Sequence, residues 1–534
     1  MKEIEEILPP EILSLATIII DLQQLLINVS SSNVAQVAQS IFESDFFKDD
    51  SSICRFVEHF IEASDYRPSK IHLLCQVLIE LLNLFNSETI KTKLTNELLK
   101  QFLASVSSPS PFPNESSRPF FLYQCFKYEI FTKDEIIDAL NDFVDNYIWF
   151  VTPSAWLVAY FIDIVPQSLI EKVMKKFSSD TEKIFLIFYF NYFTSDNKNT
   201  DLEMSRNLNK LKYIFMNEID EQTYVPHRQD NLKNIIRNDD INEFQNYLSS
   251  TNFDLNEKLD PSIFEENWLV QFFPTLICYA AYFGSVKIFK YLLLNHADTQ
   301  IRDSQDHTLS HFAVAGGNIE IIRLVEQNDC DFSRTIEIIS RFNRPEIFEW
   351  LHETKFSEFS NDVLIQSCYC GNIETVLKCI EAECPINAIT SPFYPQTPLL
   401  KAAENGKKDV LLILLSIKNI NPNFSCLGES PLIFAARNGR TECVRVLCES
   451  GKIDINYVGP KGTALHYAVQ HCQIDVIKVL IQQKNININT KNYSDKTALQ
   501  IAQKMGATKI IHLIQPHDSF FTKVTNQIQN WWRS

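Results

Sequence analysis

The chain has 534 residues, of which 45% are hydrophobic, so it is long enough for two or three domains or one long repeat array and apolar enough to bury a core. This content excludes a wholly disordered polypeptide. The formal charge of -17 is unevenly spread, because residues 1–400 carry 32 basic against 57 acidic side chains, whereas residues 401–534 carry 17 against 9.

The N-terminus, Met-Lys-Glu-Ile-Glu-Glu, lacks the basic region that opens a secretory signal. The longest unbroken apolar run, residues 184–190, is too short to span a bilayer. The thirteen cysteines show no close-paired secretory spacing, which indicates free thiols in a reducing compartment. We therefore expect a soluble, cytoplasmic protein.

All eleven glycines lie at Gly284 or later in the chain. Because tight hairpin turns need residues with positive φ, the part before Gly284 favours helices joined by Ser, Asn, Asp and Pro loops. Apolar residues repeat at helical spacing in residues 74–85 and 94–106, and Thr132 with Glu135 is a candidate capping box. We expect an N-terminal helical domain over residues 1–225.

Residues 107–117, Ser-Ser-Pro-Ser-Pro-Phe-Pro-Asn-Glu-Ser-Ser, form a predicted loop. Its prolines lack amide donors and its serines offer competing hydrogen bonds. This loop is a possible break within the helical domain.

The C-terminal part repeats one short pattern four times. Thr397-Pro-Leu-Leu-Lys-Ala-Ala-Glu-Asn-Gly is followed by copies that open at Ser430, Thr463 and Thr497, so the period is nearly constant. Thr or Ser at the first position can cap a helix, Pro fits its first turn, and Gly at the tenth position can end it. This pattern and period resemble the ankyrin repeat.

The same register finds weaker copies upstream. Thr275–Gly284 and Thr308–Gly317 are separated by the same period, and shortened units follow at Arg334–Leu351 and Asp362–Ile380, with a first unit at Asp230–Leu248. We expect about nine units, degenerate over residues 226–395 and regular over residues 396–515. The chain resembles protozoan ankyrin proteins in which degenerate middle repeats, a domain of unknown function, follow a helical N-terminal region.

The resemblance implies an all-α fold, in which helix pairs stack into a solenoid with short β-turn fingers. It also implies a non-enzymatic scaffold or adaptor that recognises a protein partner on a concave face of fingers and first helices. The predicted binding residues line that face in successive units: Phe424, Tyr457, Lys461 and Tyr493 on fingers, with Lys401, Glu404 and Arg437 on first helices.

No catalytic, cofactor or metal site is expected. Glycine-rich phosphate loops are excluded from residues 1–283, where Cys75 is expected to fill an apolar helix stripe beside His72. Cysteines 368, 370, 379 and 384 cluster downstream of His352, but their C-x-C-x8-C-x4-C spacing fits no common zinc pattern. In repeat register they fall where other units carry Ala403, Asn405, Leu414 and Ala297, and they are interpreted as small hydrophobic residues that fill the fold.

Two segments and the charge distribution leave alternatives open. Residues 516–534, which include Phe521, Trp531 and Trp532, form a predicted amphipathic helix that caps the array or docks a partner, or alternatively contacts a membrane. The apolar insertion 257–273 either packs the helical half onto the repeats or acts as an interaction finger. No nucleic-acid motif accompanies the scattered lysines, so the basic end suggests an acidic protein partner, or self-association through the acidic body.

A further alternative is that the protein is a regulatory subunit whose helical half binds a separate enzyme. Nothing in the sequence indicates a particular oligomeric state.

Overall fold

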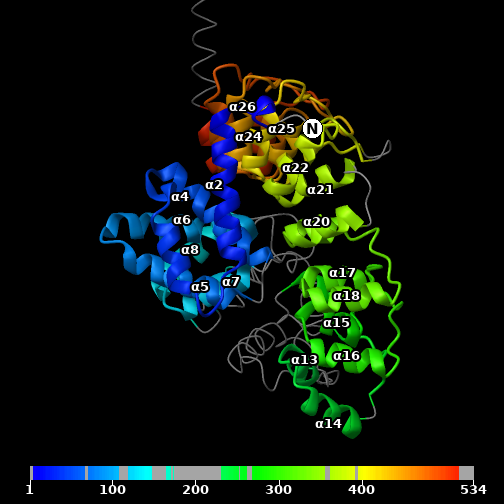
Figure 1. The fold of residues 1–534 in the computed structure, drawn as a ribbon. Helices are drawn as coiled ribbons and strands as arrows, with labels where there is room; N and C mark the ends of the chain where they lie inside the picture. The colour runs from blue at the N-terminus through cyan, green and yellow to red at the C-terminus, as the bar shows by residue number, and fades with distance from the viewer. Residues whose placement is uncertain are drawn as a thin grey trace, which may run out of the picture. The chain divides into compact units, whose positions relative to one another are not determined.

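The computed structural model describes residues 4–66, 70–106, 118–146, isolated positions between 161 and 172, and residues 230–251, 253–260, 267–354, 361–390 and 395–515. Within these residues the regular secondary structure is helical, with isolated β-bridges only, which confirms the all-α prediction (Figure 1). The chain divides into two compact units, one of residues 1–20 with 352–534 and one of residues 21–351.

The N-terminal part is a set of packed helices. Two predicted helices are confirmed, because residues 74–85 and 94–106 lie almost wholly within α5 and α6. The capping box is also present: the Thr132 N–H donates to Glu135 Oε2 at 2.8 Å, and the Glu135 N–H donates to Thr132 Oγ1 at 3.3 Å. The helices are α1 (Ile4–Ile7), α2 (Pro10–Ile27), α3 (Val34–Phe42), η1 (Asp45–Phe47), α4 (Asp50–Tyr66), α5 (Ile71–Leu84), α6 (Glu88–Val106), α7 (Arg118–Lys127) and α8 (Lys133–Asn146).

Helix α2 is long and apolar enough to cross a membrane by length and composition, with a mean hydropathy of 1.5 over its 18 residues. Its apolar residues form no long unbroken run, because Ser14, Thr17 and Asp21 interrupt them. A third of the helix is buried, including Ala16, Ile19 and Leu26.

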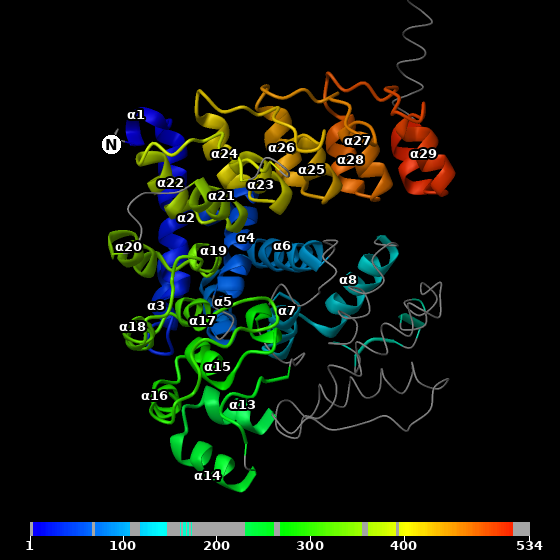
Figure 2. The ribbon, with the colours of Figure 1, turned by 90° about the vertical axis from the view of Figure 1, so that its right-hand side faces the viewer.

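From residue 230 onward the helices come in pairs. In the regular repeats the first helices α23, α25, α27 and α29 contact one another in succession, and so do the second helices α24, α26 and α28, which gives two layers (Figure 2). The helices are α13 (Asp230–Arg237), α14 (Ile241–Thr251), α15 (Leu276–Phe283), α16 (Val286–Leu294), α17 (Leu309–Gly316), α18 (Ile319–Gln327), α19 (Ile336–Arg341), α20 (Pro345–Thr354), α21 (Asn361–Cys370), α22 (Ile373–Glu381), α23 (Pro398–Asn405), α24 (Lys408–Ser416), α25 (Pro431–Arg437), α26 (Thr441–Glu449), α27 (Ala464–Gln470), α28 (Ile474–Ile481) and α29 (Ala498–Met505), followed by helical residues 508–515.

The first helices begin as the sequence pattern predicts. Thr397 Oγ1 accepts the Leu400 N–H at 3.2 Å, and Pro398 occupies the first turn, where its missing amide donor has no cost. The same side-chain cap is made by Thr275, Ser430 and Thr497. The opening residue of each of these units therefore fixes the start of a helix.

The tenth position of each of the nine units has a left-handed backbone. Three units without glycine there place Asp239, Asn343 and Cys472 in this conformation, with φ of 51°, 43° and 53°. The shortened units therefore share this conformation at the position that their inferred register gives. The other six units place glycine there, with φ between 68° and 84°: Gly284, Gly317, Gly371, Gly406, Gly439 and Gly506.

Asparagine carboxamides link three fingers to the fingers that follow them. Asn423 Nδ2 donates to the Lys452 carbonyl at 3.0 Å, and its Oδ1 accepts the Asp454 N–H at 2.9 Å. Both polar groups of the side chain are thus satisfied by backbone of the following unit. The same pair of hydrogen bonds is made by Asn387 to residues 419 and 421 and by Asn456 to residues 485 and 487.

The eleventh position supplies a second link between units. Arg344 donates to the carbonyls of Ala315 and Gly316, at the C-terminal end of the first helix of the preceding unit. Such carbonyls have no partner within their own helix, so this donor caps the helix from outside. Equivalent bonds run from Ser285 to Ile236, from Arg440 to Glu404 and from Gln473 to Arg437.

The described part of the apolar insertion packs on repeat units. The Leu259 N–H donates to the Pro274 carbonyl at 2.8 Å, and Leu269 in η4 (Trp268–Gln271) is fully buried. The Phe272 carbonyl accepts the Ser304 N–H of the next finger at 2.9 Å. The predicted loop 107–117 and the predicted tail helix 516–534 lie outside the described residues.

Candidate functional site

The candidate site is a row of charged side chains across three regular repeats. Arg437, on α25, donates to Glu429 Oε2 at 2.8 Å and lies 4.0 Å from Glu404 Oε1 of α23. Lys401 Nζ donates to Glu404 Oε2 at 3.2 Å. On the other side, Tyr467 of α27 donates to Glu429 Oε1 at 2.7 Å. We call these five residues the charged row.

The charged row is linked by hydrogen bonds and ion pairs and is also partly open to solvent. The side chains of its charged members keep between 14% and 28% of their exposed area, so each is partly accessible. Charges alternate along the row, and each carboxylate lies between two donors. Partly buried ion pairs of this kind fix side-chain geometry more than they add stability.

Aromatic rings flank the charged row. The Arg437 guanidinium lies 4.6 Å from the centroid of the Phe434 ring, and Lys401 Nζ lies 5.6 Å from that of Tyr369. These are cation–π distances. Phe424 is partly buried against a cluster formed by Leu400, Cys426 and Phe434. Phe434 is itself buried, so the partly exposed Arg437 is the member of the row whose residue type is enriched at protein-binding surfaces.

The structure joins some of the predicted binding residues and leaves others apart. Lys401, Glu404 and Arg437 lie in one network, as their shared face predicted. Lys461 approaches it through its backbone, since the Lys461 N–H donates to Tyr467 Oη at 3.3 Å. The remaining predicted residues lie on fingers outside the charged row: Phe424, half-buried Tyr457, and Tyr493, which is 77% exposed.

The sequence interpretation missed Glu429 and Tyr467. Burial and the hydrogen bond to Glu429 raise the pKa of the Tyr467 hydroxyl well above its ordinary value, so it acts as a permanent donor. Burial, with Arg437 and Lys461 nearby, lowers the pKa of His471. Nothing in this arrangement resembles an activated nucleophile with its base.

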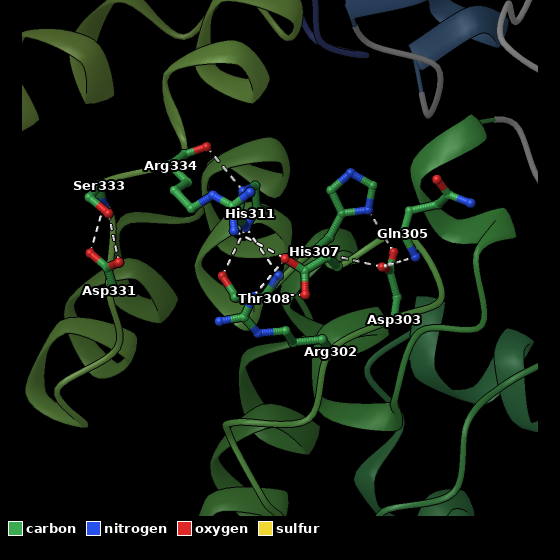
Figure 3. A network of polar contacts seen from close by, with 10 residues as sticks. Arg302, Asp303, Gln305, His307, Thr308, His311, Asp331, Ser333 and Arg334 are labelled. Carbon is green, nitrogen blue, oxygen red and sulfur yellow. Dashed lines mark hydrogen bonds and ion pairs between the residues drawn. The ribbon is translucent and has the colours of Figure 1, made fainter.

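A second polar network connects two of the earlier units. Asp303 holds the finger before α17, because its carboxylate accepts the N–H groups of Gln305 and His307 and pairs with His307 Nδ1 at 2.7 Å (Figure 3). Asp306 pairs with Arg302 at 2.7 Å and with Arg334 of the next unit at 3.0 Å. These contacts are local caps and links between units, so we assign this network to the fold.

His311 forms a capping box in the same network. Its Nδ1 accepts the Thr308 N–H at 3.1 Å, so its Nε2 carries the proton and donates to the Arg334 carbonyl at 3.0 Å (Figure 3). The ring is therefore neutral. Burial and the charge of His307 lower its pKa to about 4, and the Arg334 charge also lowers it, whereas the hydrogen bond to the Arg334 carbonyl and the charge of Asp303 oppose this shift. Burial also lowers the pKa of His466, which is placed in the same way.

We expect acid to destabilise the fold through His311. The folded pKa of about 4 lies below the ordinary 6.5. The stabilisation is therefore fully present above pH 6.5 and is lost as the pH falls toward 4, at a cost on the order of 2 kcal/mol. Urea unfolding at pH 7, 5.5 and 4.5 measures the loss.

His311→Gln is the matched variant, because the last unit already uses Gln500, whose Oε1 accepts the Thr497 N–H at 3.0 Å. The variant should show a shallower dependence of the free energy of unfolding on pH between 6.5 and 4.5. Identical pH dependence in the two proteins would show that His311 is not the titrating group.

The cysteine cluster shows the features of apolar filling. Burial raises the pKa of the Cys368 thiol, and the hydrogen bond with Cys384 and burial raise that of Cys379. Cys75 and Cys125 are also buried, with their sulfur atoms 3.9 Å apart. In the part of the chain that the structure describes, no three His, Cys, Asp or Glu side chains are grouped so as to hold a metal ion.

Comparison with known families locates the repeats independently. A family model of ankyrin repeats in three copies matches residues 364–459 and 453–525, and a model of ankyrin repeats in many copies matches residues 277–325. A search of curated proteins finds no match. The charged row lies within the first of these matched segments, apart from Tyr467, which lies in the second.

Proposed function

Since the C-terminal half of the chain contains ankyrin repeats, we propose that the protein is a non-enzymatic scaffold or adaptor that binds a protein partner on the first helices and fingers of residues 396–506. The carrying observation is the charged row. It spans three repeats, remains partly exposed and contains an arginine, a residue type that is enriched at interfaces.

We also propose that the partner is acidic. Residues 401–534 carry 17 basic against 9 acidic side chains. In the described part of that region, the Lys461 ammonium group is exposed and has no ion pair. A basic surface attracts an acidic partner and speeds its association.

The test is affinity purification with the full chain as bait, after chemical crosslinking in cells, for wild type and Arg437→Gln. Removing the guanidinium leaves Glu404 and Glu429 without their shared cation, so partner recovery should fall about tenfold. Circular dichroism melting verifies that each variant is folded.

Arg445→Gln is the matched control. It lies on α26 of the same repeat, is half-exposed and pairs with Glu442 at 3.4 Å in the other layer of helices. Partner recovery with this variant should equal that of wild type. Equal recovery with Arg437→Gln, or failure of the wild-type chain to retain any protein reproducibly, would contradict the proposal.

A further inference from the structure

The finger before α25 has an apolar residue at its tip in an unfavourable conformation. Cys426 and Glu429 exchange two backbone hydrogen bonds of 3.0 and 2.9 Å around Leu427 and Gly428, whose φ values are 50° and 80°. A two-residue turn with positive φ at both positions favours Asn-Gly or Gly-Gly. Leucine is strained in this conformation, and Leu427 remains 65% exposed. Neither local geometry nor burial in the fold explains a leucine here.

Three fingertips lie side by side. Gly428 lies against the ring of Pro460 in the next finger, so that a Cβ on the glycine would be 3.1 Å from Pro460 Cδ. Asn492 Nδ2, in the following finger, donates to the Lys461 carbonyl at 3.2 Å. The loops that hold these tips follow one another along one edge of the regular repeats (Figure 2). We call Leu427, Pro460, Lys461 and Tyr493 the fingertip ridge.

The fingertip ridge is both apolar and basic. Five large hydrophobic side chains are markedly exposed in the described residues, and two of them, Leu427 and Tyr493, belong to the ridge. Between them lies Lys461, exposed and without an ion pair in the described residues. The neighbouring Lys491 is neutralised by Asp495 at 2.9 Å, so Lys461 supplies the free charge of the ridge.

We propose that the fingertip ridge docks an extended segment of the protein partner in which a large apolar side chain is flanked by acidic residues. This inference rests on the proposed function and specifies the chemistry of its partner. The apolar side chain packs between Leu427 and Tyr493, and a neighbouring carboxylate pairs with Lys461. Strain at Leu427 is retained because the side chain contributes to binding, as in other surfaces where function opposes stability.

The test uses a fluorescent, acetylated twelve-residue peptide with a central leucine among glutamates, titrated against the full chain at two salt concentrations. Leu427→Gly should raise Tm by about 2 °C, because glycine suits the turn, yet weaken peptide binding about tenfold. A residue with a purely structural role could not give these opposite changes. Lys461→Gln should also weaken binding and reduce its dependence on salt.

Two control peptides separate the contributions, one with lysine in place of every glutamate and one with serine in place of leucine. Both should bind at least about tenfold more weakly. Unchanged binding by Leu427→Gly, equally tight binding of the lysine peptide, or no binding of the glutamate peptide would overturn the inference.

These outcomes would not contradict the proposed function. A partner whose recovery depends on Arg437 would still support that function, even if the fingertip ridge bound no peptide. Analytical ultracentrifugation tests whether the chain self-associates. If it does, and Leu427→Gly abolishes the association, the ridge binds a second copy of the chain, which would overturn the inference of a separate partner.

Discussion

Replacing Gly316 with alanine is expected to destabilise the protein by about 2–4 kcal/mol. Gly316 ends α17 where that helix lies against α15, and an added Cβ would be 2.4 Å from the Ala281 carbonyl oxygen and 2.6 Å from that of Tyr282. Both obstacles are backbone atoms, which no side-chain rotation can move. The two first helices would have to separate, and adjacent side chains would lose contact.

Urea unfolding measures the loss, and hydrogen exchange of peptides from α15 and α17 locates it, since repeat arrays need not unfold as one unit. Gly451→Ala is the control, because its added Cβ meets no atom within 4 Å, so the only cost is that of alanine at a positive φ (64°), a cost that helical Gly316 does not have. It should cost only about 1 kcal/mol. If the two variants lost equal stability, the close approach of α15 and α17 would not be the cause.

Arg344→Met is expected to cost about 2–3 kcal/mol. The Arg344 guanidinium donates to the Ala315 carbonyl at 3.2 and 2.6 Å and to the Gly316 carbonyl at 2.8 Å. Burial lowers its pKa only to about 10, so it remains charged at neutral pH. Methionine fills similar space but cannot donate, which leaves the end of α17 without these partners.

The comparison with Arg323→Met isolates this effect. Arg323 is an exposed residue of α18, and its replacement should change the free energy of unfolding by less than about 0.5 kcal/mol. Hydrogen exchange at the end of α17 should accelerate only in Arg344→Met. Faster exchange there in both variants, or in neither, would contradict the capping role.

Much of the repeat region could be predicted because its signals are local. Thr397 caps its own helix, and the left-handed tenth position is a requirement of the turn, so sequence spacing alone located both. The same frame held in the degenerate units, where Asn343 replaces glycine. The apolar character of helix α2 was missed because isolated polar residues break its apolar residues into short runs. Its mean hydropathy is nevertheless high over all 18 residues.

The charged row was only partly predictable. Lys401, Glu404 and Arg437 project from first helices at fixed positions of the repeat, so register placed them on one face. Glu429 and Tyr467 are 38 residues apart, and their 2.7 Å hydrogen bond depends on how two units stack. Periodicity assigns Tyr467 to the packed face of its helix and does not reveal where its hydroxyl points.

The asparagine links also determine how such a chain can change in length. Asn423 and Asn456 each form hydrogen bonds with backbone groups 29 and 31 residues further along the chain. Removal of residues 424–456 would therefore place Asn423 next to the backbone groups that Asn456 now binds. A deletion that is one residue longer or shorter would leave both polar groups of the carboxamide misplaced. Asn387 reaches 32 and 34 residues ahead, where its unit is correspondingly longer. Only insertions and deletions of whole repeats would therefore preserve both hydrogen bonds of each asparagine link.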